Sequence, residues 1–518
     1  MKKFFYLFAL SILFLNVNSQ NLIPKITKKN VFINQIDNKI DIDFDVTDHD
    51  NGDLEVKCRI YNISVDKKYE EVIPQMIDGD IGFPVKQGVN KKISIYLDLV
   101  STPSNLVIVL SAYDREAMDI KELISQVSPA KLQEHLLQIQ GKRNTSDPTF
   151  YNASRTYITN QTEKYLPIKT LQTISPPYTC INYEATKLGT NNPSNIIAMD
   201  AHYDCVPISP GADDNGSGVV GVLEAIRILS EYSFKKSVRF LFFDLEELGL
   251  IGSSVYIANQ IDKRDSIKSV INFEMIGYYS DVPNSQVFPN GFNVLFPEAY
   301  NAVVANNNKG DFITNVGCTN SAYLMVAFKT NANTYVPELK VISLEAFGTG
   351  TFTPDLRRSD HAVFWDRNIP AVMITDGANF RNKNYHTAKD SSHYLNFDFM
   401  ANVVRAAIAT LVDWGEIEHG TSIEIPLDLS TASKNLNSYK FYTIYERDHF
   451  LLKSNSNIKN ATLELFDVIG NSVCEEKSDL QSDILTRIHC PSLIPGIYYL
   501  TVKYSTGAQT QKIFVHGF

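Results

Sequence analysis

The chain has 518 residues and a formal net charge of −10. That length is too great for a single hydrophobic core and predicts about three domains. The excess of acids argues against binding to nucleic acid or to an anionic membrane surface. Six cysteines are sparse for this length, so folding must depend on hydrophobic cores rather than on a disulfide framework.

The first residues, Met1–Ser19, are predicted to be a secretory signal peptide. Two lysines precede the apolar run Phe4–Leu15, which is too short to cross a bilayer. The alternative is a buried N-terminal strand or helix. No other stretch of the sequence is long and apolar enough for a transmembrane span. We therefore expect an exported protein that is secreted or held at the cell surface.

Residues 20–114 are predicted to form an all-β domain. Apolar and polar residues alternate along its expected strands, which cover residues 40–46, 54–60, 93–99 and 106–112. The pattern resembles an immunoglobulin-like or fibronectin-like sandwich. The segment also carries an acid-rich run, namely Asp43, Asp45, Asp48, Asp50 and Asp53. Such a run is typical of a solvated turn, and a calcium site is the alternative.

Residues 115–415 are predicted to form an α/β domain with a mostly parallel sheet flanked by helices. Its expected strands cover residues 195–200, 237–243, 268–273 and 370–375, with an edge strand at 179–184. Its expected helices cover residues 120–127, 129–140, 217–232 and 397–412. Alternating strands and helices favour a parallel sheet, in which ligands bind at the carboxyl ends of the strands.

Histidines and acids occupy those strand ends and the loops that follow them. These candidate donors are His202, Asp214, Glu246, Glu247, Glu274 and His386. Carboxylates brought together in one crevice repel one another unless a cation neutralises them. Imidazole nitrogen combined with carboxylate oxygen suits zinc or a similar first-row divalent metal. The sequence therefore predicts a metal site at this edge of the sheet.

Five blocks of sequence in this order resemble peptidase family M28, a family of co-catalytic zinc aminopeptidases. The blocks are Ala201–Asp204, Gly211–Gly218, Phe243–Gly249, Asn272–Met275 and Asn384–Thr387. The resemblance covers roughly residues 120–415 and implies the zinc-exopeptidase type of α/β fold.

The resemblance also implies two zinc ions per chain. Carried over by position, His202, Asp214 and Glu274 would hold one ion. Asp214 would bridge to the second ion, which Glu247 and His386 would complete. Many relatives carry Asp where this chain has Glu274, whose longer side chain can still reach a metal.

The implied activity is metal-dependent removal of N-terminal residues from peptides that have a free N-terminus. Glu246 would be the general base beside a metal-bridged hydroxide, and Asp204 would orient His202. The less regular residues 281–350 are expected to shape the substrate pocket. The alternatives are a single-zinc acyltransferase like glutaminyl cyclase, a carboxypeptidase that acts on acidic dipeptides, and a catalytically inert surface-binding protein.

Two further motifs lie near these blocks. Gly216–Gly221 has the spacing of a dinucleotide-binding turn, but it does not directly follow a strand, and Asp213 and Asp214 would face the phosphate. Close packing of the helix start is the simpler interpretation. Ser359–His361 resembles a block that M28 relatives carry near the active site, and a capped helix start with a packed histidine is the alternative.

The C-terminal part is predicted to be a polar linker at residues 416–440 followed by a β domain at 441–518. Expected strands cover residues 462–468, 496–502 and 511–515. Leu463–Gly470 and Ile494–Tyr499 resemble the C-terminal sorting domain of type IX secretion substrates, which implies contact with a secretion machinery. A small adhesion domain is the alternative. Cys474 and Cys490 are expected to form a disulfide because they share this small segment.

Overall fold

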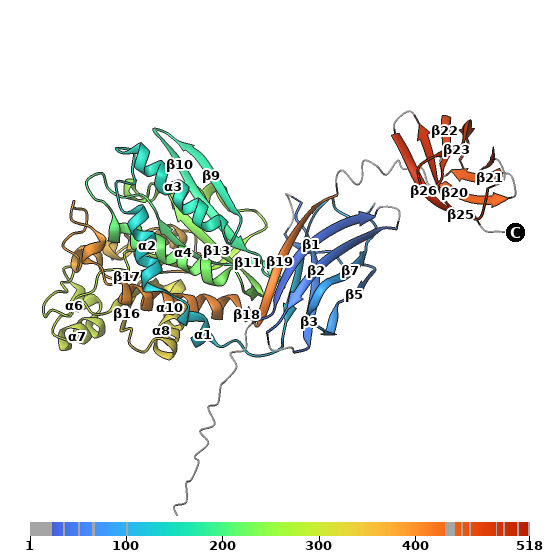
Figure 1. Ribbon diagram of the computed structural model, residues 1–518. Coiled ribbons are helices and arrows are strands. Elements are labelled where there is room, and N and C mark those ends of the chain that lie inside the picture. Colours follow the sequence, from blue (N-terminus) through green and yellow to red (C-terminus); the bar gives the residue numbers. More distant parts are fainter. Residues whose placement is uncertain are drawn as a thin grey trace, which may run out of the picture. The chain divides into compact units, whose positions relative to one another are not determined.

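The computed structural model describes residues 23–34, 37–49, 52–64, 68–99, 102–429, 441–446, 449–454, 457–482, 484–490, 493–504 and 507–515. The predicted signal peptide lies outside these ranges. Within them, no helix combines the length and the apolar character that a membrane span requires. The chain divides into two compact units, of which the first holds most residues up to Leu427 and the second holds mainly residues 428–518 (Figure 1).

The N-terminal segment is β-rich, as predicted. One sheet has the order β1 (Lys25–Asn34), β2 (Lys39–Thr47), β7 (Gly88–Tyr96) and β5 (Met76–Gly79). The other has the order β19 (Gly420–Asp428), β8 (Asn105–Tyr113), β3 (Leu54–Asn62) and β4 (Glu70–Glu71), with β6 (Gly82–Val85) also paired to β3. Alternation along β2 buries Ile40, Ile42, Phe44 and Val46 completely.

The acid-rich run of this segment is partly neutralised by lysines. Asp45 lies 2.9 Å from the ammonium group of Lys29, and Asp53 pairs with Lys86. Asp50 lies outside the described residues. Among the described residues, the groups of acids and histidines close enough to share a metal lie in the α/β domain and not in this run.

Strand β19 shows that the predicted linker at residues 416–440 was wrong over its first part. Residues Ile417–Glu418 form β18, which pairs with β12 (Ser233–Phe234), and β19 lies beside β8 in the N-terminal sheet. Ile425 is 1% exposed and Leu427 is 9% exposed. The Ser/Thr content of the segment hid this period-two alternation, which is the signal of a half-buried strand. Residues 430–440 of the predicted linker lie outside the described residues.

Shortening the buried side chain of β19 is therefore expected to destabilise the protein. Ile425→Ala should lower the free energy of unfolding by about 2–5 kcal/mol, because it leaves a cavity in a packed sheet. Urea unfolding followed by fluorescence measures the change. Ile174→Ala is the control, since Ile174 is 74% exposed. Equal stability of the two variants would show that residues 420–428 do not pack as a strand.

The α/β domain is built on an eight-stranded mixed sheet. Its order is β16 (Val341–Ala346), β15 (Ile313–Cys318), β17 (Ala371–Thr375), β14 (Ser266–Phe273), β11 (Asn192–His202), β13 (Lys236–Phe243), β10 (Tyr178–Lys187) and β9 (Ile168–Ser175). The neighbouring strands from β17 through β13 are parallel. Strand β15 runs antiparallel to β17 and parallel to β16, and β10 runs antiparallel to both β13 and β9. The strand expected at the edge is β10, but β9 pairs outside it and forms the edge.

Helices cover both faces of this sheet (Figure 1). They are α1 (Ile120–Ser125), α2 (Pro129–Ile139), α3 (Pro148–Glu163), α4 (Gly218–Leu229), α5 (Ile251–Val255), α6 (Phe292–Leu295), α7 (Pro297–Ala305), α8 (Ala322–Tyr335), α9 (His361–Asp366) and α10 (Phe397–Gly415). Met199 of β11 packs into the core that α4 and α10 share, whereas Ala198 faces the opposite core with Trp365. Both faces are buried, which explains the continuous apolar runs of these strands.

The second unit is also β-rich, as predicted. One of its sheets has the order β20 (Phe441–Glu446), β21 (His449–Ser454) and β24 (Leu485–His489). The other has the order β23 (Ser472–Leu480), β22 (Ile458–Phe466), β25 (Gly496–Tyr504) and β26 (Gly507–Val515). Alternating apolar residues of β22 and β25, such as Leu463, Leu465 and Leu500, form the core of this unit.

Candidate metal centre

A first group of donor atoms lies where β11, β13 and β14 end. His202 is the last residue of β11, Glu246 lies in the turn after β13, and Glu274 directly follows β14. One side-chain donor atom from each lies within 4.8 Å of the other two. The Nε2 atom of His202 is 3.2 Å from a carboxylate oxygen of Glu274 and 4.0 Å from one of Glu246.

A second group consists of Asp214, Glu247 and His386, whose donor atoms also lie within 4.8 Å of one another. The Nε2 atom of His386 is 3.0 Å from Oδ2 of Asp214 and 3.2 Å from Oε2 of Glu247. The other oxygen of Asp214, Oδ1, is 3.6 Å from Nε2 of His202. Asp214 therefore faces both groups, one oxygen to each. All six donors named from the sequence are brought together.

Several of these donors are buried polar atoms without a hydrogen-bond partner in the described part of the chain. They are both ring nitrogens of His202, Oδ2 of Asp214, Oε1 of Glu247 and Nε2 of His386. A buried polar atom without a partner is costly, and most native structures avoid it. Nitrogen and oxygen donors left in this state fit the needs of a divalent cation.

The charges of the centre also favour a cation. Burial, with a contribution from Glu247, raises the pKa of Asp214, and burial likewise raises the pKa of Glu246. Burial alone would lower the pKa of His386, but the nearby carboxylates of Asp214 and Glu247 raise that pKa to about 10. Burial would lower the pKa of His202 as well, and Glu246 and Glu274 outweigh it and raise that pKa. The clustered carboxylates thus favour a positive charge within the centre, which a divalent cation can supply.

Asp204 lies beside His202, as expected, and it also contacts the turn after β13. Its Oδ1 atom is 3.4 Å from Nδ1 of His202. The backbone N–H groups of Glu246 and Glu247 donate to its two carboxylate oxygens at 3.0 and 3.2 Å. Sequence analysis missed this second contact, because backbone donors leave no mark on the residue pattern. One carboxylate therefore connects the His202 segment to both glutamates.

Backbone strain gathers at the same centre. Leu245, Met275 and His386 have φ angles of 55°, 55° and 56°, in the left-handed region. For side chains other than glycine this region costs of order 1–3 kcal/mol, and it persists where surrounding contacts hold it. Each of these residues is a donor or lies next to one, so the strained turns aim the donors into the crevice.

In the Ser359–His361 block, Ser359 contacts the centre, whereas His361 has a packing role. The Ser359 hydroxyl donates to Oε2 of Glu274 at 2.7 Å, so it supports a donor of the first group. His361 is fully buried, with Nε2 2.9 Å from the carbonyl oxygen of Leu356, and burial lowers its pKa to about 4. His361 is therefore a packed histidine outside both donor groups.

The glycines of Gly216–Gly221 serve close packing. A Cβ atom at Gly221 would lie 2.9 Å from the ring of Phe273, and one at Gly218 would lie 2.4 Å from Oδ1 of Asn215. That Asn215 oxygen accepts the backbone N–H of Gly218 at the start of α4. The simpler interpretation of the motif is thus the one that fits the structure.

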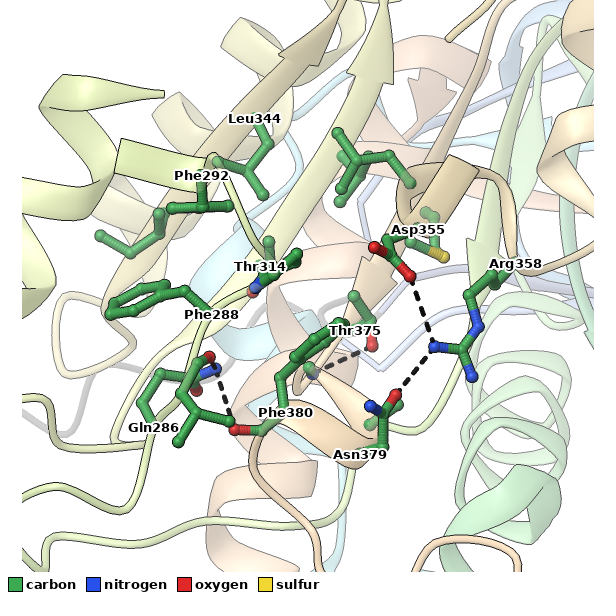
Figure 2. A pocket seen from close by; sticks show the side chains of 18 of the residues that line it. Gln286, Phe288, Phe292, Thr314, Leu344, Asp355, Arg358, Thr375, Asn379 and Phe380 are labelled. Carbon is green, nitrogen blue, oxygen red and sulfur yellow. Dashed lines mark hydrogen bonds and ion pairs between the residues drawn. The ribbon is translucent and has the colours of Figure 1, made fainter. Parts of the chain in front are cut away.

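Figure 2 shows a pocket with largely apolar walls. It reaches the first donor group, because Glu274 is part of its lining. Glu274 and Tyr385 line it on the side of the centre. Its apolar walls include Phe288, Phe292, Phe312, Leu344, Met373 and Phe380. The charged Arg358 and Asp355 also line it, 3.8 Å apart, and Arg358 donates to Asn379 and to the Tyr385 hydroxyl at 2.8 and 2.9 Å. Several of these residues, such as Phe288 and Leu344, come from residues 281–350, the less regular segment that was expected to shape the pocket.

The α/β domain thus gathers two histidine–carboxylate groups at its strand ends, each of which could hold a metal ion. Residues 184–411 match the model of peptidase family M28, and residues 446–516 match that of the secretion system C-terminal sorting domain. The chain therefore contains an M28 peptidase domain followed by a sorting domain, as the sequence blocks predicted.

Curated relatives match the peptidase part. An uncharacterised Escherichia coli protein, YfbL, is 35% identical over 230 residues, which are 42% of this chain and 66% of that protein. Leucine aminopeptidase 2 of Trichophyton rubrum is 28% identical over 234 residues, which are 43% of this chain and 40% of that enzyme. The chain thus spans less than two thirds of the length of these relatives.

Solved structures resemble the chain more distantly. The Legionella pneumophila LapA aminopeptidase has a TM-score of 0.43 at 19% identity, over 58% of this chain and 74% of its own. Porphyromonas gingivalis glutaminyl cyclase has a TM-score of 0.42 at 16% identity, over 56% of this chain and 99% of its own.

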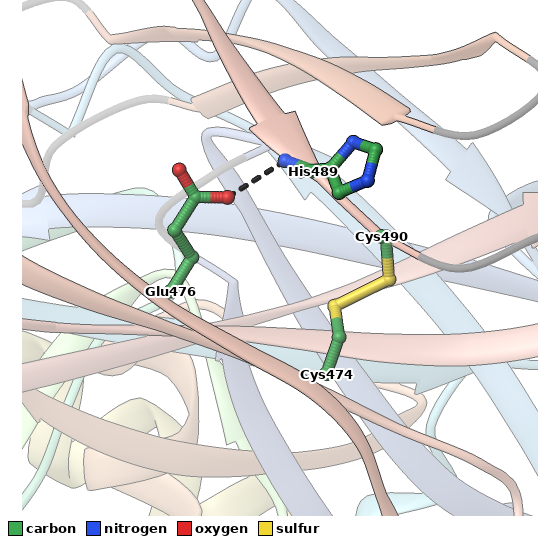
Figure 3. The surroundings of a disulfide bond; sticks show 4 residues. All are labelled: Cys474, Glu476, His489 and Cys490. Atoms are coloured by element: carbon green, nitrogen blue, oxygen red, sulfur yellow. Dashed lines mark hydrogen bonds between the residues drawn. A yellow bond between two sulfur atoms is a disulfide. The ribbon is translucent and has the colours of Figure 1, made fainter.

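The sorting domain holds the disulfide expected from the sequence. Cys474 and Cys490 are bonded, with their Cα atoms 5.9 Å apart (Figure 3). Next to this bond, the carboxylate of Glu476 accepts the backbone N–H of His489 at 2.6 Å. Both links join β23 to the chain at the end of β24. A disulfide agrees with a sorting domain, because both belong to proteins that leave the reducing cytosol.

Proposed function

We propose that the protein is an exported, metal-dependent aminopeptidase. The observation that carries the proposal is the pair of histidine–carboxylate groups that Asp214 joins inside an M28 peptidase domain. The aminopeptidase relatives support the reaction, and the sorting domain supports export to the cell surface or the medium.

The donor set suits zinc. Of the first donor group, His202 and Glu274 would hold one ion together with Asp214, which leaves Glu246 free. Asp214, Glu247 and His386 would hold the other ion. Divalent ions in such a centre act as Lewis acids that polarise the scissile carbonyl and acidify water.

The protein's own contribution to catalysis is assigned to Glu246. Its carboxylate takes the proton of the attacking water and then delivers it to the leaving amine as the peptide bond breaks. Burial raises its pKa, which makes it a stronger base than an exposed glutamate. Asp204 holds the backbone of Glu246 in place during both transfers.

Metal depletion tests the proposal. The purified full chain is expected to hydrolyse aminoacyl-arylamides, to hold two zinc ions, and to lose activity after exhaustive chelation. Restoring zinc should restore turnover. One ion per chain together with cyclisation of N-terminal glutamine would favour the glutaminyl cyclase alternative. Full activity after metal removal would contradict the proposal, and no hydrolysis by the metal-loaded protein would favour an inert binding protein.

The pocket predicts which N-terminal residues are accepted. Its walls are mostly apolar, and its charged residues Arg358 and Asp355 are engaged with neighbours. An unpaired charge would lose several kcal/mol on burial there. Leucine and phenylalanine arylamides are therefore expected to have kcat/KM at least about a hundredfold above those of aspartate and lysine. Equal rates across this panel would show that the pocket does not hold the first residue.

A further inference from the structure

Arg155 of helix α3 connects the ends of two neighbouring strands behind the metal centre. One guanidinium nitrogen donates to Oδ2 of Asp244 at 2.8 Å, and Nε donates to the Tyr203 hydroxyl at 2.9 Å. The Arg155 side chain is 14% exposed and that of Asp244 is fully buried. Tyr203 directly follows His202, and Asp244 begins the turn that carries Glu246.

Other residues complete this connection. The Tyr151 hydroxyl donates to Oδ1 of Asp244, and the Arg155 guanidinium lies 3.8 Å above the centre of the Tyr151 ring. The backbone N–H of Ile181 donates to Oδ2 of Asp244 at 2.8 Å, and the Tyr203 hydroxyl donates to the carbonyl oxygen of Ile181 at 2.7 Å. Helix α3 and strand β10 thus both hold the two strand ends.

The turn after Asp244 needs this support. Leu245 has a φ angle of 55°, which costs of order 1–3 kcal/mol unless neighbouring contacts impose it. Asp204 holds the turn from the side of the metal centre through the N–H groups of Glu246 and Glu247. Asp244 and its partners hold it from the opposite side. Arg155 is the side chain that ties this second contact to the segment of His202.

We propose that Arg155 is a positioning residue for the aminopeptidase reaction. Through Asp244 and Tyr203 it fixes the separation between His202 and the Glu246–Glu247 turn, without contact to substrate or metal. The role rests on the proposed function. Supporting residues around metal ligands typically contribute 10–100-fold to activity, so the loss of this one should be visible in turnover rather than in substrate binding.

Arg155→Met tests the role, with Arg264→Met as the matched control. The Arg264 side chain is 15% exposed, pairs with Asp262, and lies 5.0 Å from the Tyr69 ring, but it does not touch the centre. Arg155→Met is expected to lower kcat by about 10–100-fold, with KM changed less than about twofold. Arg264→Met should keep kcat within about twofold. Its melting temperature should fall about as much as that of Arg155→Met.

Two further variants keep the test decisive. Arg155→Lys can still pair with Asp244, so it should recover part of the lost kcat. Tyr203→Phe removes only the hydroxyl between Arg155 and Ile181. It therefore replaces Arg155→Met in the test if Arg155→Met does not fold. A kcat for both Arg155→Met and Tyr203→Phe equal to that of the control would overturn the role. A wild-type chain without hydrolytic activity would instead reject the proposed function and this role with it.

Discussion

Replacing Glu246 with glutamine is expected to lower kcat by about 10²–10⁴-fold while both metal ions stay bound. The amide keeps the size of the side chain but cannot take a proton from water. The carboxylate of Glu246 lies 4.0 Å from Nε2 of His202, farther than that of Glu274 at 3.2 Å. The substitution leaves the proposed ligands of the first ion, His202, Asp214 and Glu274, in place. Initial rates with a leucine arylamide, measured together with metal content, check the result.

The neighbouring glutamate provides the contrast. Glu247→Gln removes a donor that lies 3.2 Å from His386, so it is expected to lose metal from the second group along with activity. Both substitutions would then greatly lower activity, but Glu246→Gln would keep its metal content and Glu247→Gln would not. Near-normal turnover of Glu246→Gln would assign the proton transfer to another residue. Loss of metal from that variant would make Glu246 a ligand.

The strand ends were predictable because apolar runs and polar motifs alternate along the α/β segment. Each of the four strands expected before a donor is present, as β11, β13, β14 and β17. Parallel strands bring their carboxyl ends to one edge, so residues far apart in sequence could be placed together. The candidate metal donors were predicted from this rule and from the argument that a cluster of acids needs a cation.

Residues 115–165 are mixed and helical by their sequence, but no separate helix was assigned to α3, which carries Tyr151 and Arg155. Its apolar positions are few, so it lacks a strong 3.6-residue stripe. A start signal was nevertheless present, because Asp147 accepts the N–H of Phe150 and Pro148 opens the first turn. Tyr151 and Arg155 make their contacts behind the centre through hydrogen bonds, which apolar spacing does not reveal.

The pocket and the strained turns could not be predicted for a different reason. Phe288, Leu344 and Phe380 meet only after β15, β16 and β17 have paired, and nothing in their local sequence marks them as neighbours. The positive φ angle at Leu245 is imposed by tertiary contacts, because leucine rarely adopts that region. Sequence periodicity reports burial, whereas these features depend on long-range packing.

Replacing Arg143 with methionine is expected to lower the free energy of unfolding by at least about 3 kcal/mol. Arg143 is completely buried. It donates to the carbonyl oxygens of Tyr203, Ile139 and Gly211, each at 2.7 Å, and to that of Pro210 at 3.2 Å. Methionine fills similar space without a donor, so several buried carbonyl groups would lose this partner, and each such loss is costly.

The same substitution should also weaken metal binding. Three of the carbonyl groups that Arg143 holds, those of Tyr203, Pro210 and Gly211, belong to the loop that leads into Asp214. Loosening this loop moves the carboxylate that faces both donor groups. Urea unfolding and zinc titration of the full chain measure the two effects, with the exposed neighbour substitution Lys142→Met as control. Arg143→Met with the stability and zinc affinity of that control would mean that the loop holds its shape without the guanidinium.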